Sequence, residues 1–374
     1  MGGATISFLN MIMGVKAKGV TPIVVLPLVK NGEELETRLK ENDIEYYRKY
    51  IIPSRINQDL HFSNCLRWIV KYLYLSFQKK RSEKELSELI NQIKPDIIHT
   101  NVGSIHEGFK VAQKEKIPHV WHIREYQTKD FNWFIYPSFR KFTQLLKQSY
   151  VVTITDDLRN YFGIDSNEKA QTIYNGIFPT NECVFEYEKE PYFLMASRIS
   201  PEKGHVDVVK AFSEFCKINN NFILKIAGFG NNEYIDELKK IAKDRRCEDK
   251  IEFLGYQKDV KSLMKKAQAL VVASYNEGFG RMTAEAMFCG TIVIGRETAG
   301  TKEILNKTGG FFFNTVEEMI SKMEEVSNLN KEEHSKIACE AQQKAVALFS
   351  TESNIDKILS LYDDILMHNH NLNR

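Results

Sequence analysis

The segment EGFGRMTAEAM at residues 277–287 decides the fold, because it joins a buried strand to a helix through a glycine-rich turn. Residues 269–274, which precede it, are apolar and β-rich, and this pattern predicts a buried parallel strand. After Gly280, small and apolar residues predict a helix packed on that strand. A strand, a glycine turn and a helix N-terminus form an anion site, because free backbone N–H groups and the helix dipole point to one place.

Two carboxylates frame this turn. Glu277 is expected in the turn itself, and Glu285 about a turn and a half into the helix. Carboxylates repel phosphate but accept hydrogen bonds from sugar hydroxyls, so a nucleotide sugar would suit both the carboxylates and the anion site. The alternative is an ordinary strand–helix turn that carries two surface glutamates.

The composition predicts a globular protein of two domains. The chain has 374 residues, of which 43% are hydrophobic and 27% charged. A net charge of only +2 argues against a nucleic-acid partner. The six cysteines form no C-x-x-C pair and no apolar run is long enough to span a membrane, so a cytoplasmic location is expected.

Both halves of the chain alternate strand and helix, which predicts two doubly wound α/β domains. The expected parts are an N-terminal domain at 1–176, a C-terminal domain at 177–350, and a final helical segment at 351–374. The chain opens at a glycine turn that enters a helix, so the first strand of the N-terminal domain is expected to be missing, and a truncated start is the favoured explanation. Helices are expected at 6–18, 33–41, 83–93, 108–115, 205–219, 234–245, 260–267, 281–288 and 355–366.

Several further segments carry a family resemblance. They are the glycines at 2–3, YNGI at 174–177, SRISPEKG at 197–204, the glycines at 228 and 230, and the E-x7-E pattern of 277–285. Together and in this order, they resemble the retaining glycosyltransferases of family 4. That resemblance implies the GT-B fold, with two facing Rossmann-like domains and a C-terminal helix that crosses back to the first. Ile292 and Ala299 depart from the family pattern, where proline and glycine are usual.

The resemblance implies a role for each site residue. Glu277 would contact the donor sugar on the catalytic face, and Glu285 the ribose. Arg198 and Lys203 would bind the donor diphosphate, although each could instead be a solvated loop cation. No D-x-D motif occurs, so no metal is expected, and no sequence signature indicates a cofactor. The other expected donor contacts are Gly3, Phe279 and Gly280.

The N-terminal domain offers polar residues after two predicted strands, where ligands of open α/β sheets bind. His122 matches the family's histidine near the donor sugar and is the second catalytic candidate. A structural role for this histidine is the alternative. The remaining acceptor-side candidates are His99, Asn101 and Arg124.

Residues 65–81 are aromatic, apolar and basic, and allow contact with a membrane surface. The competing and favoured interpretation is a domain helix that buries its apolar face.

Overall the sequence predicts the transfer of a hexose-type sugar from a nucleoside-diphosphate sugar to a saccharide or lipid-linked (polyprenyl) acceptor, at the inner face of the cytoplasmic membrane. The rivals are a sugar-nucleotide epimerase of the same fold and a non-catalytic subunit that binds nucleotide sugars.

Overall fold

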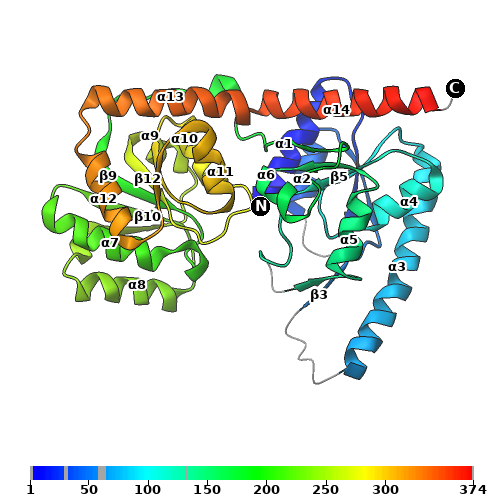
Figure 1. Cartoon of the computed structure of the whole chain (residues 1–374), viewed down its shortest axis with the longest axis horizontal. Helices are drawn as coiled ribbons and strands as arrows, with labels where there is room; N and C mark the ends of the chain where they lie inside the picture. The colour runs from blue at the N-terminus through cyan, green and yellow to red at the C-terminus, as the bar shows by residue number, and fades with distance from the viewer. Residues whose placement is uncertain (1–2, 29–32, 58–64, 131–132, 373–374) are drawn as a thin grey trace. The chain divides into compact units, whose positions relative to one another are not determined.

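The computed structural model describes residues 3–28, 33–57, 65–130 and 133–372 (Figure 1). The chain divides into two compact units. Unit 1 comprises Met1–Gly176 together with Asn354–Arg374, and unit 2 comprises Ile177–Ser353. Each unit has its own parallel sheet and its own core.

Unit 2 is built on a six-stranded parallel sheet in the order β11-β10-β9-β12-β13-β14. Its central strands are buried over most of their length, as expected where helices cover both faces of a parallel sheet. Along the chain, β10 is added beside β9 and β11 beside β10, and the next strand, β12, then lies on the other side of β9. The order therefore reverses between β9 and β12. The strands are β9 (Glu190–Ala196), β10 (Ile223–Ala227), β11 (Ile251–Gly255), β12 (Ala267–Val272), β13 (Ile292–Arg296) and β14 (Phe311–Phe313).

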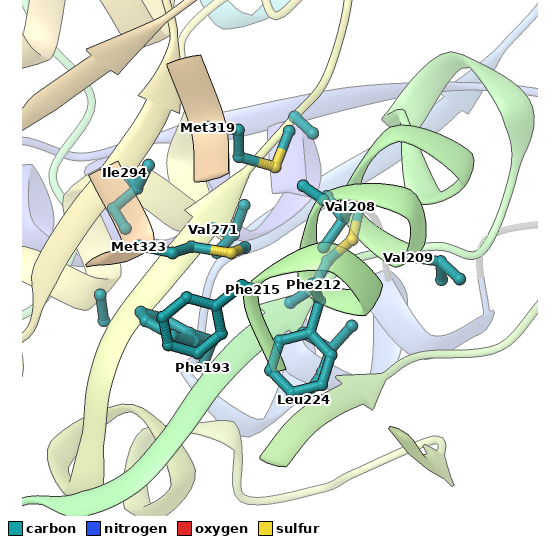
Figure 2. Close-up of a cluster of buried hydrophobic side chains, with 14 of the residues drawn as sticks. Phe193, Val208, Val209, Phe212, Phe215, Leu224, Val271, Ile294, Met319 and Met323 are labelled. Atoms are coloured by element: carbon teal, nitrogen blue, oxygen red, sulfur yellow. The ribbon is translucent and has the colours of Figure 1, made fainter. Parts of the chain in front are cut away.

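Helices pack on this sheet through apolar side chains (Figure 2). On α7, Phe212 and Phe215 are fully buried in one cluster with Phe193 of β9 and Val271 of β12, and α12 adds Met323. Burial of each large side chain contributes roughly 1.5–3 kcal/mol. The helices of unit 2 are α7 (His205–Ile218), α8 (Asn232–Asp244), α9 (Val260–Lys266), α10 (Arg281–Phe288), α11 (Ala299–Thr308), α12 (Val316–Ser327) and α13 (Lys331–Phe349).

Unit 1 contains three separate sheets among its described residues. The largest is a four-stranded parallel sheet in the order β4-β5-β7-β8, beside a parallel pair β1-β2 and an antiparallel pair β3-β6. The first described element is a helix. The elements are α1 (Gly3–Ala17), β1 (Ile23–Pro27), α2 (Glu33–Glu41), β2 (Glu45–Lys49), β3 (Arg55–Asn57), α3 (Cys65–Ile93), β4 (Ile98–Thr100), α4 (Glu107–Glu115), β5 (His119–Ile123), β6 (Trp133–Ile135), α5 (Phe139–Leu146), β7 (Tyr150–Thr153), α6 (Asp156–Tyr161) and β8 (Ala170–Thr172).

The C-terminal helix α14 (Thr351–Leu372) completes the core of unit 1. Its buried face packs with Leu9 and Ile12 of α1 and with Val120 of β5. The prediction that the last helix returns to the first domain is confirmed (Figure 1). The four buried residues of this face are Ile355, Ile358, Leu361 and Ile365.

Helix α3 corrects two expectations from the sequence. The helices expected at 65–81 and at 83–93 form one continuous helix that begins at Cys65 (Figure 1). The favoured interpretation, in which the apolar face of 65–81 is buried, is wrong for much of that segment. Five large apolar side chains of α3 are between 54% and 71% exposed, whereas Leu75, Leu86 and Ile90 of the same helix are buried. The exposed five are Ile69, Val70, Leu73, Tyr74 and Phe77.

No helix among the described residues is both long enough and apolar enough to cross a membrane.

Candidate active site

The predicted donor residues of unit 2 lie on loops that follow β9 and β12, beside the point where the strand order reverses. Ligands of open α/β sheets bind at such a point, beyond the carboxyl ends of the strands. The backbone N–H of Tyr275 donates to Glu202 O at 3.1 Å, which ties the two loops together. Gly204 has φ +76°, and a Cβ there would lie 2.3 Å from Ala273 O. Glycine is therefore required where the basic loop meets the end of β12.

Lys203 and Glu277, predicted from separate motifs, form an ion pair across these loops. Lys203 Nζ donates to Glu277 Oε1 at 2.5 Å, and Ser274 Oγ donates to the same oxygen at 2.8 Å. Both ionic side chains are about one-fifth exposed, so the pair remains accessible from solvent. Arg198, on the same loop as Lys203, is more exposed and pairs with Glu202. The arrangement places two cations at the end of the central strands, each paired with a carboxylate.

Helix α10 positions the second glutamate. Gly280 stands at its N-cap with φ 85°, and Glu285 follows within the helix. Arg281 Nε donates to Glu285 Oε1 at 2.5 Å. The E-x7-E pattern concerns only the two glutamates, so it does not predict this contact. Phe279 turns its ring into the core, where it packs edge-on against Phe349. Only the backbone of Phe279 therefore suits the predicted donor contact.

The N-terminus of α11 closes against this turn. Gly300 N donates to Glu277 O at 2.9 Å, and a Cβ on Gly300 would lie 2.4 Å from the Phe279 backbone. Thr301 Oγ1 is buried and has no hydrogen-bond partner among the described residues. Thr301 is not among the site residues predicted from the sequence, although its position in the first turn of a helix is a signal that could have identified it. Ala299, which replaces a family glycine, adopts the left-handed φ of 44° that favours glycine.

The candidates of unit 1 lie together at the carboxyl ends of β4 and β5. His99 Nε2 lies 3.2 Å from His122 Nδ1, and Arg124 Nε donates to Asn101 Oδ1 at 2.9 Å. His99, Asn101, His122 and Arg124 therefore form one polar cluster. Gly3, the donor contact expected in this unit, is the first residue of α1, and no hydrogen bond in the described part of the chain joins it to the cluster; the neighbouring Gly2 falls outside the described residues.

The burial of this cluster sets its charge. His122 is fully buried, and desolvation together with the nearby Arg124 lowers its pKa well below the usual value. The same two causes lower the pKa of His99 to about 3. Desolvation lowers the pKa of Arg124 to about 9. Near pH 7 the two histidines are therefore neutral and the guanidinium is charged.

Within the part of the chain that the structure describes, no group of three or more His, Cys, Asp or Glu side chains is arranged to hold a metal ion.

The chain is similar to known glycosyltransferases. Residues 182–344 match the family model described as glycosyl transferases group 1. N-acetyl-alpha-D-glucosaminyl L-malate synthase of Bacillus anthracis is 26% identical over 244 residues, which cover 60% of this chain and 62% of that protein. The O-antigen chain mannosyltransferase RfbU of Salmonella typhimurium is 30% identical over 190 residues, covering 50% and 51%. The matched part is thus less than two thirds of either relative's length.

A solved structure resembles the whole chain. The crystal structure of Anabaena HepE in complex with UDP superposes with a TM-score of 0.78 and 18% identity, covering 97% of this chain and 96% of that one. This likeness concerns the fold, and it confirms the predicted GT-B architecture. The motifs, the family match over residues 182–344 and the two relatives thus make this chain similar to the glycosyl transferases of group 1.

Proposed function

We propose that the chain is a retaining, metal-independent glycosyltransferase that moves a hexose-type sugar from a nucleoside diphosphate to a saccharide or polyprenyl-linked acceptor. The observation that carries this proposal is the Lys203–Glu277 pair at the reversal of strand order, with Arg198 and Glu285 on the adjoining elements. Two named glycosyl-transferring relatives and the UDP complex of HepE support it.

The chemistry assigns a task to each side chain. Departure of the nucleoside diphosphate places negative charge on the β-phosphate, and Arg198 and Lys203 neutralise that charge. Glu277 accepts hydrogen bonds from the sugar, and Glu285 from the ribose. The acceptor attacks C1 on the face that the phosphate leaves, and the departing phosphate takes the acceptor's proton. The C1–O bond to phosphate breaks while the new C1–O bond forms, so the anomeric configuration is retained.

A donor panel tests this proposal. Thermal-shift measurements with UDP-, GDP-, dTDP- and ADP-sugars should show one base class that raises the melting temperature, because a bound ligand stabilises the native state. The stabilising donor is then incubated with saccharide and polyprenyl-diphosphate acceptors. Transfer with retained configuration supports the proposal. Binding without transfer to any acceptor would instead favour a non-catalytic subunit.

We also propose that the exposed apolar face of α3 contacts an anionic membrane surface. Ile69, Leu73 and Phe77 follow one another at four-residue spacing on one face of the helix. The same face continues into the cations Lys80 and Lys84. An apolar stretch followed by cations matches a bilayer interface with anionic headgroups, whereas a second copy of the chain would bring like charge to the same place. A peripheral position of this kind would bring the protein to a lipid-linked acceptor at the cytoplasmic face.

Vesicle sedimentation tests this contact. The wild-type chain should bind vesicles that contain phosphatidylglycerol more tightly than vesicles of phosphatidylcholine alone. Leu73→Gln with Phe77→Gln should weaken binding to both, while Ile218→Gln, at an equally exposed position of unit 2, should leave binding unchanged. Lys80→Gln with Lys84→Gln should reduce the free energy of binding to the anionic vesicles by about 1 kcal/mol per cation removed, and should leave binding to the phosphatidylcholine vesicles unchanged. Absence of vesicle binding, or a dimer in sedimentation velocity that the Leu73 and Phe77 changes dissociate, would contradict the proposal.

A further inference from the structure

The polar cluster at the ends of β4 and β5 extends into a hydrogen-bonded chain that reaches helix α14. Tyr362 Oη lies 2.6 Å from His99 Nδ1. His99 Nε2 lies 3.2 Å from His122 Nδ1, and Arg124 Nη2 lies 3.4 Å from that same nitrogen. Three elements of unit 1 thus contribute to one series of contacts that ends at the His122 ring.

The guanidinium decides in which direction these hydrogen bonds run. Arginine can only donate, so His122 Nδ1 must accept, and the single proton of a neutral imidazole must then be on Nε2. His99 Nε2 faces the same lone pair and must also donate. His99 Nδ1 is consequently an acceptor, and Tyr362 donates to it. Both contacts to His122 Nδ1 are long, as expected when two donors share one lone pair.

We propose that Arg124 fixes the direction of the Tyr362–His99–His122 chain and so holds His122 as a neutral hydrogen-bond donor through Nε2–H, rather than as a general base. The position of Arg124 is itself determined by two amide oxygens. Its Nε donates to Asn101 Oδ1, and its Nη1 donates to Asn175 Oδ1. His99, Asn101 and Arg124, which the sequence offered as acceptor contacts, are therefore positioning residues.

The other ring nitrogen indicates what His122 is positioned for. His122 Nε2 is buried and has no hydrogen-bond partner among the described residues. A buried N–H without an acceptor is unfavourable, so this geometry suits an oxygen acceptor from a ligand. A hydroxyl oxygen of the sugar substrate supplies one. This last step rests on the proposed function, whereas the tautomer does not.

The tautomer can be measured directly. The full chain labelled with ¹⁵N-histidine is examined by long-range ¹H–¹⁵N correlation at pH 7, and the His122 signals are assigned by their loss in His122→Gln. Wild-type protein should show the Nε2–H form. Tyr362→Phe should alter the signals of His99 and leave His122 in the Nε2–H form, because Arg124 still donates. Arg124→Met should release His122 to the Nδ1–H form or a mixture, and the exposed Arg140→Met should change neither.

The wild-type spectrum alone can overturn the proposal, since an Nδ1–H or charged His122 would contradict it even if Arg124→Met failed to fold. An unchanged His122 in folded Arg124→Met would also contradict it.

The ligand-facing role of His122 is tested by donor affinity. His122→Gln keeps an N–H donor and His122→Met removes it, so the Met variant should bind the sugar donor about tenfold more weakly than the Gln variant, with equal affinity for the free nucleoside diphosphate. Equal donor affinities would overturn this role. If the wild-type chain bound no nucleotide sugar, the proposed function would fail while the tautomer result stood.

Discussion

Lys203 Nζ lies 2.5 Å from Glu277 Oε1, so the cation assigned to phosphate is paired with the carboxylate assigned to sugar. This pairing balances charge between two loops that leave the sheet from neighbouring strands. An arriving donor would exchange both partners at once: the diphosphate replaces Glu277 at Lys203, and the sugar hydroxyls replace Lys203 at Glu277. Neither charged group would then be left unpaired in the half-buried site.

The first prediction concerns Lys203→Met. Loss of one charge-assisted contact to phosphate should weaken the binding of the free nucleoside diphosphate by about 1.5–3 kcal/mol, as measured by titration calorimetry. Lys225→Met is the matched control, because Lys225 is equally exposed and also faces a carboxylate, Glu190 at 3.9 Å. Equal affinities for wild type and Lys203→Met would refute the assignment of Lys203 to the diphosphate.

Arg198→Ala should also weaken diphosphate binding, yet leave stability unchanged. The Arg198–Glu202 pair is exposed on both sides, and such pairs contribute at most about 1 kcal/mol to folding. Denaturant melts of the free protein and calorimetry with the diphosphate separate the two quantities. A variant that lost stability but kept its affinity would assign Arg198 to the structure of the loop instead.

The two glutamates should differ kinetically. Glu277 is assigned to the sugar, whose contacts change as the C1–O bond breaks, so Glu277→Gln should mainly lower kcat. Glu285 is assigned to the ribose, which is bound alike in the ground and transition states, so Glu285→Gln should mainly raise the donor KM. Steady-state kinetics with varied donor measure both effects. Equal effects of the two substitutions, or a product of inverted configuration, would contradict separate roles in a retaining reaction.

Transfer should persist without divalent metal, because Arg198 and Lys203 can carry the phosphate charge. Initial rates are measured in excess EDTA and again after Mn²⁺ or Mg²⁺ is added. Rates that agree within error are expected. A rate abolished by the chelator and restored by either ion would show that the cations of the basic loop do not suffice.

Ile358→Ala should destabilise unit 1 selectively. Ile358 is fully buried in its core, and such truncations cost about 2–5 kcal/mol. All three tryptophans (Trp68, Trp121 and Trp133) lie in unit 1, so their fluorescence during urea unfolding reports on that unit. Met367→Ala, at an exposed position of the same helix, should leave the transition unchanged. A transition in Ile358→Ala that matched the wild type would contradict the packing of α14.

The sequence predicted the parts of the fold that have local signals. The strand–turn–helix at 267–288 has apolar runs and a glycine at a left-handed turn, and both features act within a few residues. Helix α3 was predicted incorrectly, because an apolar face indicates burial only when a partner covers it. No periodicity reveals whether such a partner exists: Phe77 is exposed, whereas Leu75, two residues earlier, is buried.

The candidate site shows the same boundary between local and distant signals. Glu277 and Lys203 were each recognised from a motif, but their pairing depends on the strand order, which only the folded sheet establishes. Tyr362 had no signal at all, since its partner His99 is 263 positions away along the chain. Arg281 was adjacent to the motif, and its spacing of four from Glu285 was the signal that could have identified it.

The return of α14 to unit 1 also has a consequence for biosynthesis. Ile355, Ile358, Leu361 and Ile365 belong to the core of unit 1, yet they leave the ribosome only after the whole of unit 2. Unit 2 is one uninterrupted stretch and can fold as soon as it has been made, whereas the part of unit 1 that precedes it must wait for α14. Until α14 is made, Leu9 and Ile12 of α1 lack the helix that covers them in the folded core.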